Sequence, residues 1–253
     1  MENSIIDKNI STNSEYKLCS LLFKTTANTN TNLLTFLKLI EETSHKSIIV
    51  APEVCLTGFD YDNFEAAADF FTHAMREIKK VSLGKIIIFT IIEKRDALFY
   101  NFVKVIHNGE VVYERAKAKL FLFGGEHEHF QEGESRHVEI IEIDGIKIGI
   151  LICFELRFKE LWQRLEGADV IAVPAWWGVL RKEHFKVLTQ ALAIMNQCYV
   201  IASDSLNEEC TQLSALINPQ GKVLYNGNTP CLEVQYNKKE IALMRRYMDV
   251  GIG

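Results

Sequence analysis

The sequence contains few residues of the kind that mark linkers between domains. Four of its 253 residues are proline, and no internal repeat or low-complexity tract interrupts it. A chain of this length could hold two domains of about 125 residues, but α/β folds often extend to about 250 residues as one unit. We therefore expect a single domain over residues 1–253, with residues 1–15 as a polar leader.

Long runs of positive charge are also absent. No run of Lys or Arg exceeds two residues, and the formal net charge is −5. Binding to nucleic acid requires a basic face toward the phosphates. We therefore expect no nucleic-acid partner and a small molecule as the substrate.

The chain has no long apolar segment either. Residues 1–15 are polar and contain no apolar core of the kind that a secretory signal needs, and one of the longest apolar stretches covers only residues 85–92. A helix that spans a bilayer needs roughly 20 such residues. We expect a cytoplasmic protein without a membrane partner.

The cysteines do not form any familiar pairing pattern. All six are scattered, and no two stand in a Cys-x-x-Cys arrangement. This spacing fits neither a disulfide framework nor a zinc site, and it is typical of free thiols in a reducing compartment. We expect no metal and no other cofactor.

Short apolar runs alternate with longer segments of helical period along most of the chain. The first kind predicts strands and the second predicts helices. Strands are expected at 16–23, 47–51, from 85 onward, at 169–174 and at 199–203, and helices at 32–42, 62–80, 158–165 and 183–197. Asp62 is a candidate cap of the second helix. The pattern predicts an α/β fold in which helices pack outside two sheets.

Dipeptides typical of tight turns mark the remaining strand pairs. Asn108-Gly109 and Asp144-Gly145 each separate two apolar runs, and such pairs favour two-residue hairpin turns. Residues 219–221 (PQG) predict a turn between strands near 213–218 and 231–235. The fold should therefore mix hairpins with crossover connections.

Three reactive side chains stand just after predicted strands, namely Glu53, Lys117 and Cys153. Functional groups of α/β proteins gather beyond the carboxyl ends of strands. Taken singly, they fit a solvated carboxylate, a surface charge and a buried apolar thiol. Together they are complementary, because a carboxylate can take the thiol proton and an ammonium can lower the thiol pKa and stabilise an oxyanion. The set favours acyl transfer.

The segment Glu126-His-Glu-His129 is the other dense cluster of polar side chains. Two histidines two residues apart, with no third strong ligand nearby, favour a polar loop over a metal site. Glu126 could instead support Lys117 or orient a water, because a second carboxylate near the thiol would serve a hydrolytic step.

At these residues the chain resembles the nitrilase superfamily of carbon-nitrogen hydrolases, whose catalytic set is glutamate, lysine and cysteine. Residues 52–59 (PEVCLTGF) resemble the family motif around the general base, and residues 152–158 (ICFELRF) resemble the nucleophile motif. Residues 117–121 (KAKLF) resemble the lysine motif, with Lys119 where the family usually has His. Glu126 occupies the place of the family's second glutamate.

The resemblance implies a four-layer αββα sandwich that usually forms a homodimer through its outer helices. It also implies a cofactor-free mechanism that proceeds through a thioester. Glu53 would deprotonate Cys153, and Lys117 with the backbone N–H of Phe154 would hold the oxyanion. A water assisted by Glu53, with Glu126 as a second candidate, would release the acid.

The residues around the motifs favour one branch of the family. Nitrile-cleaving members usually carry Trp directly after the cysteine, and Phe154 stands there, which favours a small-molecule amide. Trp176 and Trp177 are expected to line the pocket. Arg157 and Arg181 resemble positions of bacterial ω-amidases that act on 2-oxoglutaramate-like monoamides, and either could bind a carboxylate. A surface salt bridge is the alternative for each arginine.

Two further positions depart from the family pattern, and they leave other functions open. Met195 stands where the family usually has Glu, and Gln212 stands where it usually has Gly. Both put pocket shape and substrate preference in question. The alternatives are a hydrolase of N-carbamoyl amides, a nitrilase with the same catalytic set, or a catalytically lapsed binding protein.

Overall fold

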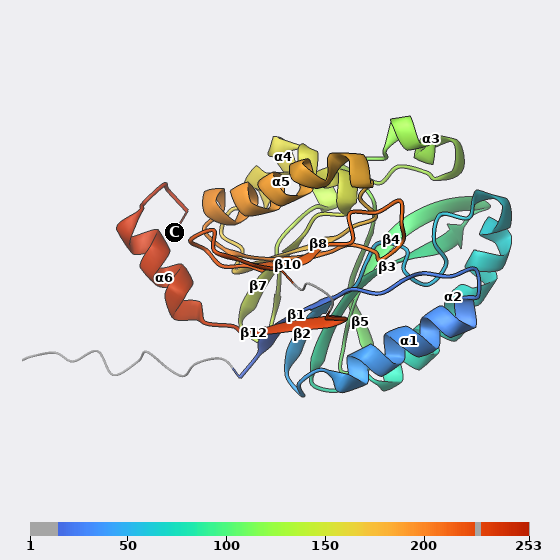
Figure 1. Ribbon diagram of the computed structural model, residues 1–253, viewed down its shortest axis with the longest axis horizontal. Coiled ribbons are helices and arrows are strands. Elements are labelled where there is room, and N and C mark those ends of the chain that lie inside the picture. Colours follow the sequence, from blue (N-terminus) through green and yellow to red (C-terminus); the bar gives the residue numbers. More distant parts are fainter. Residues whose placement is uncertain (1–14, 226–228, 253) are drawn as a thin grey trace, which may run out of the picture.

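The computed structural model describes residues 15–225 and 229–252, so most of the predicted polar leader lies outside the described residues. Within these ranges the chain forms two six-stranded sheets that pack face to face, with helices on both outer faces (Figure 1). The expected four-layer αββα sandwich is confirmed. None of the helices in the described ranges combines the length and apolar character that a membrane span requires.

The first sheet combines a parallel centre with antiparallel margins. Its order is β12 (Cys231–Gln235), β1 (Lys17–Leu21), β2 (Ser47–Val50), β3 (Lys85–Arg95), β4 (Leu98–His107) and β5 (Glu110–Ala116). Strands β1, β2 and β3 run parallel, and β2 is buried along its whole length. Helices α1 (Thr29–Glu42) and α2 (Phe64–Lys80) cover the outer face of this sheet (Figure 1).

The second sheet repeats this plan. Its order is β11 (Val223–Tyr225), β10 (Ser214–Ile217), β9 (Tyr199–Ser203), β8 (Val170–Pro174), β7 (Ile146–Ile150) and β6 (Ile141–Ile143). Helices α4 (Lys159–Arg164) and α5 (Lys182–Met195) cover its outer face (Figure 1). Helix α6 (Lys238–Tyr247) lies at one end of the sandwich, and the short α3 (Glu126–His129) lies near the opposite end (Figure 1).

Short 3-10 helices connect several of these elements. In the described ranges they are η1 (Tyr61–Asn63), η2 (Leu122–Gly124), η3 (Ser135–His137), η4 (Cys153–Arg157) and η5 (Val179–Arg181). Four of them, η1, η2, η4 and η5, follow loops that leave the carboxyl ends of strands.

The space between the sheets is a continuous apolar core to which both sheets contribute. Hydroxyl groups add polar links across it: Ser20 donates to the carbonyl of Ala202 at 2.7 Å, and Ser203 donates to the carbonyl of Leu21 at 2.6 Å. Each buried hydroxyl thus has a partner, as buried polar groups require. These links hold the two sheets in a defined relative position.

The predicted hairpin turns are confirmed, whereas the predicted helix cap is wrong. Asn108 and Asp144 have φ of 48° and 50°, and the glycine after each also has a positive φ, as the two-residue turn demands. Asp62 lies inside η1, and helix α2 begins after Asn63. The extra 3-10 turn displaces the start of the α-helix, and no side chain caps it.

The C-terminal region differs from the predicted hairpin. The turn at residues 219–221 joins β10 to β11, a strand that was not predicted. Strand β12 leaves this sheet and pairs antiparallel with β1 in the other one. Local sequence patterns do not record a pairing between residues more than 200 positions apart, so this crossover could not be predicted from them. Helix α6 was also not predicted, although Asn237 at its start is a local capping residue.

Candidate active site

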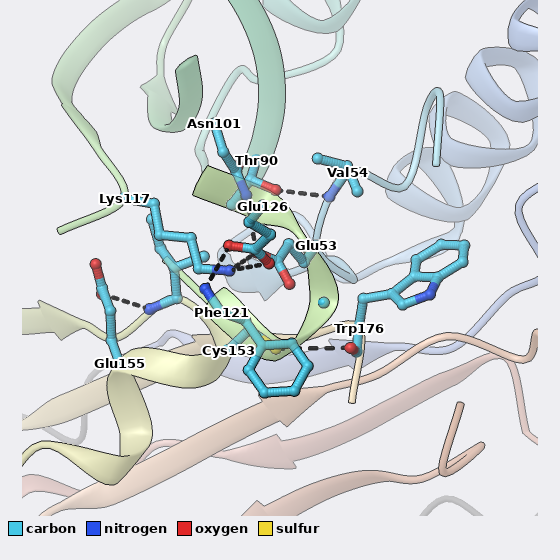
Figure 2. A network of polar contacts seen from close by, with 12 residues as sticks. Glu53, Val54, Thr90, Asn101, Lys117, Phe121, Glu126, Cys153, Glu155 and Trp176 are labelled. Carbon is cyan, nitrogen blue, oxygen red and sulfur yellow. Dashed lines mark hydrogen bonds and ion pairs between the residues drawn. The ribbon is translucent and has the colours of Figure 1, made fainter. Parts of the chain in front are cut away.

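The three predicted reactive side chains come together in one network of polar contacts (Figure 2). Lys117 Nζ lies 2.7 Å from Glu53 Oε1 and 2.8 Å from Glu126 Oε1. The thiol of Cys153 lies beside this group and interacts with the charges of Glu53 and Lys117. Glu53 and Lys117 are fully buried, and Cys153 is 7% exposed. The cluster thus combines a carboxylate, an ammonium and a thiol in a site largely sealed from water.

The backbone at Cys153 makes a sharp turn between strand and helix. Strand β7 ends at Ile150, and Cys153 begins η4 with φ of 44°, a left-handed conformation that non-glycine residues rarely adopt. Such a conformation costs of order 1–3 kcal/mol and persists only where the surroundings hold it. The turn presents Cys153 Sγ to the site, where it lies 3.6 Å from the carbonyl oxygen of Trp176.

Glu155 holds this turn and the lysine segment together. Its carboxylate accepts hydrogen bonds from the backbone N–H of Ile152 at 2.7 Å and of Ala118 at 2.6 Å. The guanidinium of Arg115 donates two more, at 2.7 and 2.6 Å. Because Ile152 precedes Cys153 and Ala118 follows Lys117, one buried carboxylate positions both. Sequence reasoning missed this role, although a carboxylate inside an otherwise apolar run was a usable sign.

Glu53 is fixed from both its backbone and its side chain. Its N–H donates to the carbonyl of Ala175 at 3.1 Å, and its Oε1 accepts from Asn101 Nδ2 at 2.8 Å. The next residue, Val54, has φ of 41° and donates its N–H to Thr90 Oγ1 at 2.6 Å. Glu53 Oε2 is buried without a hydrogen-bond partner among the described residues. Asn101 and Thr90 lie inside apolar strands, where no sequence pattern distinguishes them.

Burial and charge set the protonation of the cluster. Burial raises the pKa of Glu53, and the ammonium of Lys117 opposes this shift. Burial lowers the pKa of Lys117, but the carboxylates of Glu53 and Glu126 more than compensate, so its pKa is raised. Burial and the charge of Glu53 raise the pKa of the Cys153 thiol well above its usual value. The expected lowering of the thiol pKa by the ammonium is outweighed, and the thiol is neutral at rest.

Glu126 lies on α3 and provides the second carboxylate in contact with the ammonium of Lys117. While its Oε1 contacts Lys117, its Oε2 accepts from the backbone N–H of Phe121 at 3.0 Å. The segment forms one turn of helix instead of the expected polar loop. The ring of His129 stacks on Tyr61 with centroids 4.0 Å apart and planes at 7°. This stacking makes the histidine part of the aromatic wall near the site.

All five residues predicted to bind substrate line one pocket at the thiol. Its lining consists of Phe121, Cys153, Phe154, Arg157, Trp176, Trp177, Gly178 and Arg181. A neighbouring cavity of about 430 Å³ shares Phe121, Trp176 and Arg181 with it. Phe59, Tyr61, Val179 and Leu180 extend this cavity as an apolar wall. Of these, sequence reasoning had not identified Tyr61, Phe121, Val179 or Leu180.

The two arginines of the pocket carry no carboxylate partner. Arg157 Nη2 lies 3.0 Å from His184 Nδ1, and its guanidinium lies over the ring of Trp177 at 4.8 Å. The guanidinium of Arg181 lies over the ring of Phe121 at 5.1 Å. Burial and the charge of Arg181 lower the pKa of Arg157. Within residues 15–225 and 229–252 neither forms a salt bridge, so both remain available for an anion.

A buried aspartate supports the wall opposite the thiol. Asp204, directly after β9, accepts the N–H of Trp177 at 2.8 Å and that of Thr211 at 2.8 Å. The peptide unit that donates from Trp177 is the one whose carbonyl, on Trp176, contacts Cys153 Sγ. Burial raises the pKa of Asp204 to about 7. Sequence reasoning overlooked Asp204, although it too stands at the carboxyl end of a strand.

The three positions that depart from the family pattern are absent from the described lining of both cavities. Lys119 Nζ lies 3.7 Å from a carboxylate oxygen of Glu160. Met195 is 63% exposed at the end of α5. Gln212 has φ of 56°, the backbone region that favours glycine.

The fold and the site define an α/β sandwich that carries a thiol, a carboxylate and an ammonium in one buried cluster. In agreement with this, residues 16–243 match the model of the carbon-nitrogen hydrolase family. The chain belongs to this family, and the resemblance to the nitrilase superfamily is confirmed.

The chain is similar to individual amidases and to a solved structure of the same fold. The chain is 31% identical over 199 residues to the 2-oxoglutaramate amidase of Bacillus subtilis (strain 168), which covers 74% of this chain and 76% of that protein. It is 28% identical over 193 residues to the deaminated glutathione amidase of Escherichia coli O157:H7, covering 69% and 71%. A solved CN-hydrolase superfamily protein from Xanthomonas campestris superposes with a TM-score of 0.80 at 20% identity, covering 92% and 94%.

Proposed function

We propose that this protein hydrolyses the C–N bond of a small linear amide to a carboxylate and ammonia, through a thioester on Cys153. The observation that carries the proposal is the buried cluster of Glu53, Lys117 and Cys153, in which Glu53 Oε2 has no hydrogen-bond partner among the described residues. An unpartnered carboxylate oxygen next to a neutral thiol is a ready acceptor for the thiol proton.

The protonation states support a stepwise mechanism. Because the thiol is neutral at rest, Glu53 removes its proton as Cys153 attacks the amide carbon. The oxyanion that forms is stabilised by the ammonium of Lys117 and the backbone N–H of Phe154. Glu53 then gives the proton to the leaving ammonia and later deprotonates the water that cleaves the thioester. Glu126 keeps Lys117 charged and in place throughout.

The charge of the pocket favours an amide that also carries a carboxylate. Arg157 and Arg181 line the pocket of the thiol without a carboxylate partner in the described ranges. A guanidinium binds a carboxylate through two parallel hydrogen bonds. A monoamide of a dicarboxylic acid would satisfy the arginines and the thiol together. The named activity of the Bacillus subtilis relative, a 2-oxoglutaramate amidase, agrees with this class.

Ammonia release over a panel of amides tests the proposal. Monoamides of short dicarboxylic acids should be hydrolysed, and Cys153→Ala should abolish the activity, whereas Cys198→Ala, which changes a buried thiol outside the pocket, should not. Arg181→Gln should raise KM for the carboxylate-bearing amides and leave neutral amides unaffected. An inert panel, or equal activity of Cys153→Ala, would refute the proposal. Carbon dioxide released with ammonia would point to N-carbamoyl substrates instead.

We also propose that the protein forms a homodimer through its outer helices and works in the reducing environment of the cytoplasm. Large apolar side chains on the outer helix α5 are exposed, among them Val187, Ile194 and Met195. Apolar surface of this kind is typical of interfaces. Light scattering after size exclusion should give twice the chain mass of 28.9 kDa, and a Val187→Glu/Met195→Glu variant should give the single mass.

A further inference from the structure

Two thiols outside the candidate active site lie in direct contact. Cys19 on β1 and Cys231 on β12 have their Sγ atoms 2.9 Å apart. The strands are antiparallel neighbours, with Cys19 opposite Glu233 and Cys231 opposite Leu21, so the cysteines are diagonal partners. Both side chains pack on the face of the sheet covered by α1 and α2, not in the core between the sheets. The strands therefore hold the two sulfurs in contact, and a small movement of the strand edge would bring them to bonding distance.

The surroundings give the two thiols different properties. Cys19 is fully buried, whereas Cys231 is partly exposed. The hydrogen bond between the two sulfurs lowers the pKa of Cys231, whereas burial, together with this bond, raises the pKa of Cys19. Cys231 is thus the more accessible of the two sulfurs and the one whose pKa is lowered. Reactive thiols have this combination of exposure and lowered pKa.

We propose that Cys19 and Cys231 are an oxidation site that forms an intramolecular disulfide on reaction with hydrogen peroxide. The Cys231 thiolate attacks peroxide, so that an S–O bond forms, the O–O bond breaks and hydroxide leaves. Cys19 then attacks the sulfur of this sulfenic acid, the S–S bond forms and a second hydroxide leaves. The two protons of the thiols convert both hydroxides to water. The pair is oxidised by two electrons and the peroxide is reduced.

A metal site is the competing use of the same sulfurs. Within the described residues, the carboxylate of Glu233 and both sulfurs lie within 4.8 Å of one another. However, Glu233 already accepts hydrogen bonds from the backbone N–H of Ser44 at 2.9 Å and its hydroxyl at 3.0 Å, and it pairs with Lys17 at 3.4 Å. This leaves two sulfurs without a free third ligand, which favours the disulfide.

The bond would join the first and last strands of one sheet. The cysteines are separated by 212 positions, so the disulfide closes a loop that includes most of the chain. Closing a long loop restricts the unfolded chain and stabilises the folded one. For a domain of this size we expect the oxidised form to melt about 5–10 °C above the reduced form.

Thiol titration and peptide mapping of the full-length protein test this inference. After treatment of the reduced protein with hydrogen peroxide, titration in denaturant should show a loss of two thiols in a Cys153→Ala background, which removes the proposed nucleophile from the count. Mapping without reductant should link the peptides of Cys19 and Cys231. Cys231→Ser should lose the link and the thermal shift, while the matched variant Cys198→Ser should keep both.

Three outcomes would overturn the inference. Cys19 and Cys231 could be recovered as separately alkylated peptides after peroxide has consumed other thiols. The link could join Cys231 of two chains, which non-reducing electrophoresis would show as a doubled mass. Zn²⁺ alone could protect both thiols of the untreated protein from alkylation, while treatment with peroxide forms no disulfide between them. The experiment measures thiol reactivity and melting temperature, and neither measurement depends on amide hydrolysis. A failure of this inference can therefore be distinguished from a failure of the proposed function.

Discussion

The carboxylate of Glu155 provides a sharp test of how the site is built. Its Oε1 accepts from Arg115 Nη1 and the N–H of Ala118, and its Oε2 accepts from Arg115 Nη2 and the N–H of Ile152. Glu155→Gln preserves the size of the side chain but replaces one oxygen by an NH₂ group. In either orientation of the amide, this group faces two donors. The substitution therefore breaks hydrogen bonds to the turn of Cys153 or to the lysine segment.

The size of the effect follows from burial. The side chains of Glu155 and Arg115 are 0% and 1% exposed, so the guanidinium would remain buried without its counter-charge. Removing one partner of a buried ion pair costs about 3–5 kcal/mol. Domains are stable by about 5–15 kcal/mol in total. We expect Glu155→Gln to lower the free energy of unfolding by about 3–5 kcal/mol and to reduce amide turnover as well.

Urea unfolding followed by circular dichroism measures this loss. Glu160→Gln is the matched control, because Glu160 is an exposed carboxylate that lies 3.7 Å from Lys119, and it should change the free energy of unfolding by less than about 0.5 kcal/mol. Arg115→Gln/Glu155→Gln should cost less than the sum of the single changes, since each single change already leaves the pair broken. A loss below about 1 kcal/mol for Glu155→Gln would refute the reasoning, because a buried pair cannot be broken so cheaply.

Two further predictions concern charge at the site. Glu53→Gln should slow amide hydrolysis at least about 100-fold, and unaltered hydrolysis would count against Glu53 as the base. The same change should lower the pKa of Cys153, because a negative neighbour is lost. The rate of thiol alkylation as a function of pH measures this pKa. Asp204 has its pKa raised from 3.8 to about 7, so the stability that its protonated form contributes should be lost as pH rises between these values, because the unfolded carboxyl ionises first. Wild-type stability should therefore fall relative to that of Asp204→Asn in urea titrations at pH 4, 5.5 and 7, and an equal pH dependence of both proteins would contradict the assignment.

The cluster itself could be found from sequence because one physical rule governs it. Glu53 follows β2, Lys117 follows β5 and Cys153 follows β7, and the carboxyl ends of these strands converge although β7 belongs to the other sheet. The Asn108 hairpin was equally accessible, because a positive φ at both turn residues restricts the sequence locally. A structural constraint that acts within a few neighbouring residues restricts their types, so it can be predicted from the sequence.

The groups that orient the cluster could not be found in this way. Asn101 contacts Glu53 across 48 positions of sequence, and Arg115 contacts Glu155 across 40. Such pairs depend on strand register, which is set by the packing of whole sheets. The pairing of β12 with β1 has the same origin. The type of a residue does not indicate which distant residue it contacts when tertiary packing determines the contact.

The thiol pKa shows why correct residues can still lead to the wrong electrostatics. Beside Cys153, the sequence suggests an activating ammonium, but Lys117 lies between Glu53 and Glu126, and the three charges sum to a negative site. Burial adds to this, since a thiolate loses more hydration than a thiol. The net effect keeps Cys153 neutral until a base acts on it. The nucleophile should therefore form only during attack on a bound substrate, which protects the thiol from indiscriminate reaction at rest.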